Sequence, residues 1–264
     1  MIDCHSHLTS REFDADRAAV LQRAREAGVT HVAIVGQDAA ENAGVLASMR
    51  TPAVEGLRLL PFLGLHPDRF TDDEPPITPE EIDAICAEIR LRQDAITGIG
   101  EVGLDHWRCK TEERRALQRE AFVRLVDLAV ELDLPLNVHS RSAGHHTLEL
   151  LLERGAKRVL MHAFDGKAGH ALKGAEAGYV FSIPPSIVRS EQKRKLVRVL
   201  PLKALALETD SPVLGPDPAQ RNEPANLRRS LEAIAEIKGV AEVDVAKVTT
   251  ETARRVFRIG EERP

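Results

Sequence analysis

Two histidines, His5 and His7, lie two positions apart at the end of a short apolar run. In a β-strand, residues i and i+2 point to the same face, so the two imidazoles would project together. Such a pair is a natural start for a site that chelates a divalent cation. His-x-His alone is weak evidence, because a single histidine more often has a structural role. The pair therefore gains meaning only if later strands supply further ligands.

Later apolar runs do end in potential ligands. Each of four runs stops at a histidine or an acid, namely Glu101, His139, His162 and Asp210. Because the carboxyl ends of the strands of a parallel barrel meet at one mouth, side chains this far apart in the sequence can lie together. Four imidazoles and two carboxylates suit one or two divalent ions, and a bridging carboxylate would hold two ions about 3.5–4 Å apart. The alternative is that each residue only caps a strand or fills the core. This is a good explanation for any one residue alone, but a poor one for six such residues at one predicted mouth.

The elements that would position these residues alternate regularly. After the first run, strand-like segments occupy residues 32–35, 59–65, 96–102, 135–139, 159–162, 179–182 and 204–207. Helical patterns fill the connections, and a last helical segment covers residues 242–257. Eight strands separated by helices predict an α/β fold, a closed (β/α)8 TIM barrel with extra C-terminal helices, in which residues 1–264 form a single domain. An open doubly wound sheet is the alternative, but no Gly-x-Gly-x-x-Gly turn follows the first strand.

Composition restricts the partners. A net charge of −5 gives no basic surface for wrapping long duplex, and 3% aromatic residues disfavour an extended base-stacking platform. Trp107, after the fourth strand, would either stack a base or pack in the barrel. The basic run at residues 189–195 could steer a nucleic acid, but such runs are usually solvated helix faces, and we interpret it so. Three widely spaced cysteines, and no apolar run near 20 residues, predict a reduced, cytoplasmic protein.

Several motifs resemble the signatures of the TatD family. They occur in the family's order over nearly the whole chain, at residues 2–8, 100–105, 138–141, 162–164, 208–212 and 221–224. The variants at residues 139–144, 163–166 and 182–187 look most similar to those of the third TatD-domain paralogue of animals. The chain departs from the usual pattern at Ser142, where aspartate is common, and at residues 163–166, where many members have Cys-Phe-Ser-Gly. These departures leave the candidate ligands intact and bear on substrate preference.

The family comprises metal-dependent hydrolases on an amidohydrolase-like TIM barrel, several of them nucleases. The resemblance implies two ion sites that share one bridging carboxylate: the first from His5, His7, Glu101 and Asp210, the second from Glu101, His139 and His162. We expect two divalent ions, Zn, Mn, Co or Fe, with Mg possible but less natural beside four imidazoles. A metal-activated water would attack the substrate. Asp210 would orient this water and take its proton, so Asp210 and Glu101 are the expected catalytic residues.

Four further polar residues have expected roles around the ions. His66 and Arg141 are expected to contact a substrate phosphate, because a guanidinium matches phosphate bidentately. For Arg141, an ion pair with Glu208 or Asp105 is an equally good explanation. These two carboxylates are expected to accept a proton from a ligating imidazole, or to serve structure only.

The sequence thus favours a metal-dependent hydrolase of ester bonds, of deoxyribonuclease type, with 3′–5′ exonuclease action as one form. The expected partners are nucleic-acid ends or a small phosphoester, with no membrane and no obligate protein partner. An ester or amide hydrolase, such as an aminoacyl-tRNA deacylase or a lactonase, is the alternative, because the same centre would serve it. A non-catalytic metal-binding module is a third reading, against which the complete ligand set argues.

Overall fold

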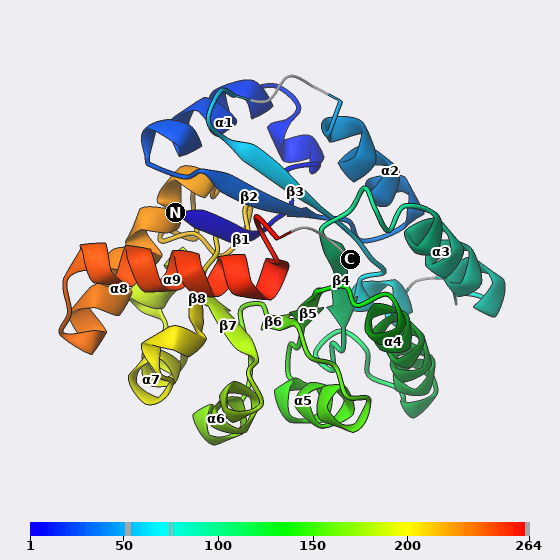
Figure 1. The fold of residues 1–264 in the computed structure, drawn as a ribbon. Coiled ribbons are helices and arrows are strands. Elements are labelled where there is room, and N and C mark those ends of the chain that lie inside the picture. The colour runs from blue at the N-terminus through cyan, green and yellow to red at the C-terminus, as the bar shows by residue number, and fades with distance from the viewer. Residues whose placement is uncertain (51–53, 74, 76, 262–264) are drawn as a thin grey trace.

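The strands of this protein form a nearly closed parallel barrel. The computed structural model describes residues 1–50, 54–73, 75 and 77–261. Within them the strands pair in sequence order, each parallel to the next. They are β1 (Ile2–Ser6), β2 (His31–Val35), β3 (Arg58–Leu63), β4 (Gly98–Gly103), β5 (Leu136–His139), β6 (Val159–Met161), β7 (Val180–Ile183) and β8 (Leu205–Leu207). The predicted (β/α)8 TIM barrel is confirmed (Figure 1).

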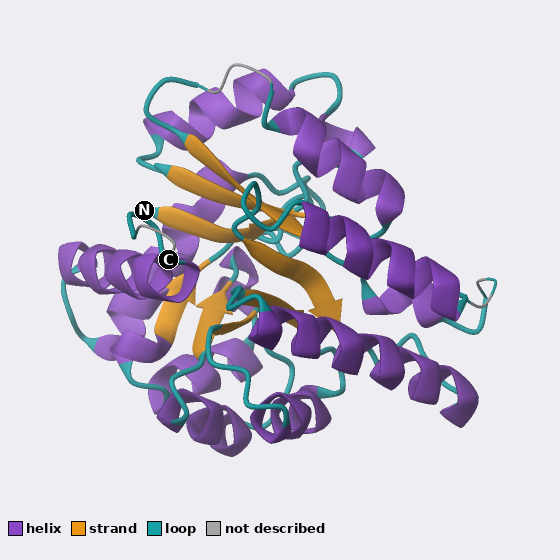
Figure 2. Ribbon diagram, turned by 45° about the vertical axis from the view of Figure 1, so that its right-hand side comes forward, coloured by secondary structure: helices purple, strands orange, loops and turns teal. Residues whose placement is uncertain are grey.

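A helix follows each strand and covers the outside of the barrel (Figure 2). These helices are α1 (Arg17–Glu26), α2 (Ala39–Ser48), α3 (Pro79–Leu91), α4 (Glu112–Glu131), α5 (Gly144–Glu153), α6 (Ala168–Glu176), α7 (Glu191–Val199) and α8 (Leu227–Lys238), and α9 (Glu242–Phe257) is the extra C-terminal helix. Short 3-10 helices lie in the connections at Arg11–Phe13, Pro67–Phe70, Pro185–Arg189, Leu202–Ala204 and Pro224–Asn226. Local sequence fixes several boundaries. Thr78 and Glu81 form a capping box at the start of α3, and Gly239, with φ of 64°, ends α8.

Apolar side chains lie on both sides of the strands. Outward-facing strand residues such as Val138 pack with the helices in one large cluster that includes Phe122. A smaller cluster inside the barrel contains Phe62, whose ring centre lies 4.9 Å from that of Phe257 on α9. The helix α9 packs on β1, β7 and β8, and crosses the barrel in Figure 1. This helix covers the amino-terminal end of the barrel, which leaves the carboxyl-terminal end for polar residues.

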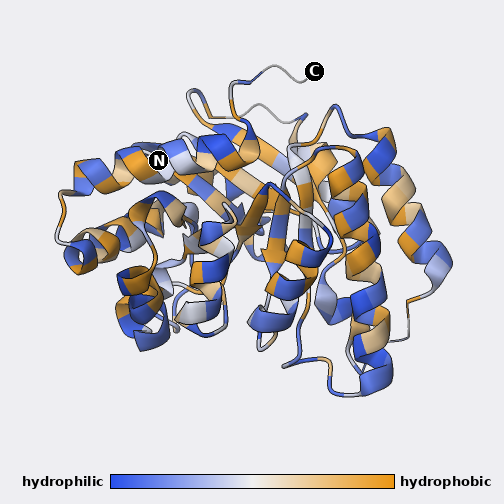
Figure 3. Ribbon diagram, turned by 60° about the horizontal axis from the view of Figure 1, so that its bottom comes forward, coloured by the Kyte–Doolittle hydropathy of each residue, from blue (hydrophilic) through white to orange (hydrophobic). Residues whose placement is uncertain are grey.

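The helices present both apolar and polar faces. Their ribbons alternate between hydrophobic and hydrophilic colours in Figure 3, as expected where one face packs on the strands and the other meets water. Within the described residues, no helix combines the length and the apolar character needed to span a bilayer.

The barrel closes beside the candidate ligands. The amide of Asp210 donates to the carbonyl of His5 at 2.9 Å, and the amide of His7 donates to the carbonyl of Ser211 at 2.8 Å. These hydrogen bonds join the chain after β8 to the end of β1. The closing contact therefore positions both histidines and the aspartate at once.

Two strands are irregular where they carry a candidate ligand. The pairing of β1 with β2 shifts between Asp3 and Ser6, around His5, and that of β4 with β5 shifts between Ile99 and Val102, around Glu101. Such an extra residue re-aims a side chain and is common next to active sites. The expected convergence of His5 with His7 thus occurs, but regular strand alternation does not explain it, because β1 is irregular at His5 and ends at Ser6.

Candidate metal centre

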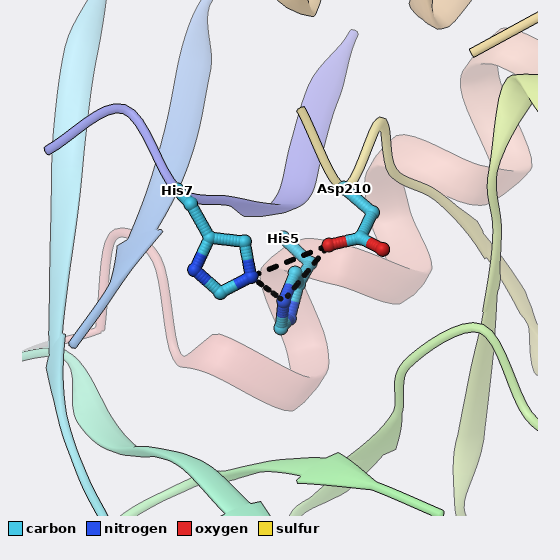
Figure 4. Close-up of side chains that lie close together, drawn as sticks. All are labelled: His5, His7 and Asp210. Carbon is cyan, nitrogen blue, oxygen red and sulfur yellow. Dashed lines mark hydrogen bonds and ion pairs between the residues drawn. The ribbon is translucent and has the colours of Figure 1, made fainter. Parts of the chain in front are cut away.

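Four potential ligand atoms meet at the carboxyl-terminal mouth of the barrel. The Nε2 atom of His5 lies 3.3 Å from Nε2 of His7 and 3.4 Å from Oε2 of Glu101. Oδ1 of Asp210 lies 3.6 Å from Nε2 of His5 and 3.3 Å from Nε2 of His7. The remaining measured pair, Nε2 of His7 and Oε2 of Glu101, is 3.3 Å apart. Figure 4 shows the two rings and the Asp210 carboxylate pointing toward one another. These atoms form the first cluster.

The other oxygen of the same glutamate faces a second set of imidazoles. Oε1 of Glu101 lies 2.8 Å from Nδ1 of His139, 3.2 Å from Nε2 of His162 and 3.2 Å from Nε2 of His66. All three residues come from the ends of strands β5, β6 and β3. The structure therefore brings the six expected ligands together, with Glu101 between the two clusters. It also places His66, an expected substrate contact, in the second cluster.

The spacing of the atoms in the first cluster suits a divalent ion. A regular tetrahedron whose corners lie about 2.1 Å from its centre, the usual distance for zinc and nitrogen, has edges of about 3.4 Å. Five of the six edges among these four atoms are known, and their lengths of 3.3–3.6 Å are close to this value. Oε2 of Glu101 is buried and receives no hydrogen bond from the described residues. A buried carboxylate oxygen without a donor, surrounded by nitrogen and oxygen ligands, is suited to a cation.

The charge states of three of the candidate ligands suit an ion. Burial raises the pKa of Asp210, but His162 and His7 outweigh this effect and hold it below its usual value. For Glu101, burial likewise raises the pKa, and the surrounding imidazoles lower it to well below its ordinary range. Burial lowers the pKa of His5, which keeps that imidazole neutral at neutral pH. Two ionised carboxylates and a neutral imidazole are the protonation states that metal ligation requires. Burial lowers the pKa values of His7 and His162, but the nearby carboxylates outweigh it and raise both, so an ion would displace protons from these two.

Comparison with known proteins identifies the family. The sequence profile of the family described as "TatD related DNase" matches residues 2–258. This chain belongs to the TatD family. The relatives are named as hydrolases or deoxyribonucleases, and the chain is accordingly a metal-dependent hydrolase of the TatD type.

Relatives of similar length support the assignment. "Deoxyribonuclease TATDN3" from Homo sapiens is 43% identical over 261 residues, which cover 97% of this chain and 94% of that protein. "Uncharacterized metal-dependent hydrolase YabD" from Bacillus subtilis is 32% identical, covering 98% of this chain and 100% of that protein. The crystal structure of YJJV, a TatD homologue from Escherichia coli K12, matches with a TM-score of 0.87 and 25% identity over 98% of each chain. The expected likeness to the third animal paralogue is confirmed.

In this TatD-family protein, a buried amide orients the first histidine. Oδ1 of Asn137 lies 2.8 Å from Nδ1 of His5, and Nδ2 of Asn137 donates to the carbonyl of Cys4 at 2.8 Å. Because the amide nitrogen is committed to Cys4, its oxygen accepts the Nδ1 proton of His5, and Nε2 keeps its lone pair for the first cluster. Sequence reasoning missed Asn137. The signal was a polar residue in a buried strand, two positions before His139 and on the same face.

Two carboxylates lie beside the imidazoles of the second cluster. Oδ2 of Asp105 is 3.1 Å from Nε2 of His139, and Oε2 of Glu208 is 3.4 Å from Nδ1 of His162. Glu208 also accepts a hydrogen bond from the amide of Ala163 at 2.8 Å. Each carboxylate contacts the nitrogen that points away from Glu101. The positions agree with the expected support of the imidazoles, while their part in activity stays a prediction.

The clusters lie in a cavity of about 570 Å³ with cations on its wall. Arg141 lines this cavity, and within the described residues its guanidinium forms no ion pair with Glu208 or Asp105. The guanidinium lies instead 5.3 Å from the centre of the Trp107 ring. Trp107 is 55% exposed, so it does not pack in the barrel. The rim of the site therefore carries an aromatic ring and a guanidinium that forms no ion pair with a described residue.

Two glycines allow the strands to approach closely at Glu101. A Cβ atom on Gly64 would clash with the backbone of Glu101, and one on Gly103 would clash with the carbonyl of His139. Gly103 has φ of 149°, which side-chain-bearing residues rarely adopt. The absence of side chains here lets β4 lie close enough to its neighbours for Glu101 to reach both clusters.

Proposed function

We propose that this protein hydrolyses phosphodiester bonds at nucleic-acid ends with two divalent ions that share Glu101. The observation that carries this proposal is the two-sided carboxylate of Glu101. Its Oε2 atom faces His5 and His7, while its Oε1 atom faces His139 and His162. A bridging carboxylate of this kind is the usual means of holding two ions about 3.5–4 Å apart.

The residues around the ions have distinct tasks in this proposal. Bound ions would activate a water molecule and neutralise charge on the phosphate. Asp210 faces the first cluster as an ionised carboxylate, and it would orient the water and accept its proton. Burial lowers the pKa of His66, but Glu101 and Asp68 outweigh it and raise the pKa to about 10. We assign His66 to binding a phosphate oxygen together with Arg141, rather than to ligating an ion.

The dimensions and charges of the cavity support the substrate class. A volume of about 570 Å³ suits a group of roughly nucleotide size better than a continuous duplex. Cutting from an end, in the 3′–5′ direction, is the mode that we propose. Hydrolysis of an aminoacyl ester or lactone remains the second candidate. The cations Arg141 and His66 favour the phosphate, because a neutral ester offers no charge for them to bind.

The test pairs metal content with hydrolysis in wild type and Glu101→Ala. We expect two ions per wild-type chain by elemental analysis, and metal-dependent release of nucleotides from an end-labelled single strand. Glu101→Ala should lose at least one ion and nearly all cleavage, since both clusters lose an oxygen. Glu41→Ala, which removes another carboxylate from the cavity wall, is the control and should keep both ions. Two bound ions with no phosphodiester cleavage would overturn the nuclease function and direct the search to esters.

We also propose that the protein acts as one domain in the cytosol. The family match over residues 2–258 supports a single functional unit. The three free cysteines, Cys4, Cys86 and Cys109, support a reducing compartment.

A further inference from the structure

One side chain of the basic run at residues 189–195 differs from its neighbours. Arg189 donates to a backbone carbonyl of the loop after β8. Arg194 forms an ion pair with Glu236 of α8 at 2.7 Å, and Lys195 is exposed. The interpretation of the run as a solvated helix face holds for these residues. Lys193, by contrast, lines the cavity that holds both clusters.

The first turn of α7 fixes the direction of Lys193. Ser190 begins the helix by accepting a hydrogen bond from the amide of Lys193. The side-chain amide of Gln192 donates to the carbonyls of Phe164 and Gly166, each at 3.2 Å. These bonds attach α7 to the loop that follows β6. Lys193 is thus held over the cavity by the backbone, not by contacts of its own ammonium group.

The ammonium group of Lys193 faces acids but contacts none of them. The carboxylates of Glu208, Asp165 and Asp210 attract it, yet within the described residues it forms no ion pair or hydrogen bond. Burial lowers the pKa of Lys193, and the three carboxylates oppose this shift. A half-buried cation without a protein partner is costly unless a ligand neutralises it. The anion that completes this arrangement would come from the substrate.

We propose that Lys193 binds the phosphate next to the scissile phosphate, and that it thereby selects polynucleotides over esters with a single phosphate. This inference rests on the proposed nuclease function. Lys193 lines the same cavity as the two clusters, but within the described residues its ammonium group forms no ion pair with Asp210 or with any other candidate ligand. We therefore place it beside the reacting phosphate rather than on it. In a nucleic acid, the next charged group along the chain is the neighbouring phosphate.

The test compares Lys193→Met with Lys195→Met, a control on the same helix whose side chain is exposed. With a single-stranded oligonucleotide, Lys193→Met should raise KM about tenfold, the loss of one charge-assisted hydrogen bond, with little change in kcat. With bis(p-nitrophenyl) phosphate, which has one phosphate, KM should not change. Lys193→Arg should restore part of the affinity for the oligonucleotide. Lys195→Met should behave as wild type with both substrates.

A binding measurement without turnover gives an independent readout. In chelator-treated protein, fluorescence anisotropy should show that Lys193→Met reduces the slope of log affinity against log salt by about 0.7, the contribution of one phosphate contact on a single strand. A methylphosphonate at one phosphate beside the scissile bond should weaken wild type about tenfold and leave Lys193→Met unaffected.

These measurements distinguish failure of the Lys193 assignment from failure of the nuclease function. If wild type cleaves the oligonucleotide but Lys193→Met has the same KM and the same salt slope, Lys193 is no phosphate contact and the nuclease function stands. An equal effect of Lys193→Met on both substrates would also overturn the assignment to the neighbouring phosphate. Failure of wild type to cleave any phosphodiester would overturn both proposals together.

Discussion

Replacement of Asn137 by alanine tests whether the structure correctly identifies the group that orients the first histidine. The change removes the acceptor for Nδ1 of His5, 2.8 Å away, and the donor to the carbonyl of Cys4. Loss of a group that orients a metal-ligating imidazole typically costs 10- to 100-fold in metal affinity, or about 1.4–2.7 kcal/mol. Two buried polar groups also lose their partners, at about 1–3 kcal/mol each. We therefore expect weaker metal binding together with a free energy of unfolding lower by about 2–6 kcal/mol.

Two further variants separate these effects. Asn137→Asp keeps an acceptor for His5 but loses the donor to Cys4, so metal affinity should be largely restored while stability stays reduced. Asn42→Ala serves as the control, because Asn42 is also a buried amide but bonds the backbone of Gly64 and no candidate ligand. It should lower stability without changing metal affinity. Affinity would be measured by competition with a chelator and stability by denaturant unfolding. Asn137→Ala with wild-type metal affinity would refute the orienting role.

Further predictions concern the cavity wall, the pH dependence and the packing of the strands. Arg141→Met should raise KM for phosphate substrates about tenfold with little loss of kcat, and an unchanged KM would contradict the proposed phosphate contact. Oligonucleotide binding should quench the fluorescence of Trp107, the single tryptophan. Burial lowers the pKa values of His7 and His162, but nearby carboxylates outweigh it and raise both. Their stabilisation of metal-free protein is therefore full below about pH 6.5 and is lost as the pH rises through the raised pKa values. Because ion binding displaces these protons, the increase in Tm on adding metal should grow from about pH 6 to about pH 8, and a constant increase in thermal-shift assays would contradict this. Gly64→Ala should destabilise by about 1–3 kcal/mol through its clash with β4, whereas Gly169→Ala, with open space around it, should keep the wild-type Tm.

The fold and the meeting of the candidate ligands at one mouth could be predicted because both follow from local patterns. Short apolar runs separated by helical stretches give the order of elements, and Glu101, His139 and Asp210 stand where such runs end. Parallel strands place those ends at one mouth, so no knowledge of distances was needed. The capping box of Thr78 and Glu81 at the start of α3 is likewise a local pattern, because it depends on residues three positions apart.

Other features depend on packing between distant segments and could not be read from the sequence. The irregular pairing at His5 and Glu101 depends on the neighbouring strands, and it decides which way these side chains point. The contact of His66 with Glu101 follows from the close approach of β3 and β4. Lys193 and Lys195 lie on different faces of α7, and hydrogen bonds from Gln192 to another loop fix which face meets the cavity. In each case the sequence supplies the residue type, and tertiary contacts supply its direction.

The contact that closes the barrel, between β1 and the chain after β8, also brings together the residues of the first cluster. A fragment that ends before β8 contains His5, His7 and Glu101 but lacks Asp210, so it has neither the closing hydrogen bonds nor the last ligand. During synthesis, the first cluster can form only after the final strand has emerged and docked. Ion binding then favours the closed ring over any state in which β1 has come away, by an amount that grows with the ion concentration. The candidate metal centre and the closing contact of the barrel thus share the same residues, and loss of metal is expected to loosen the barrel first at this edge.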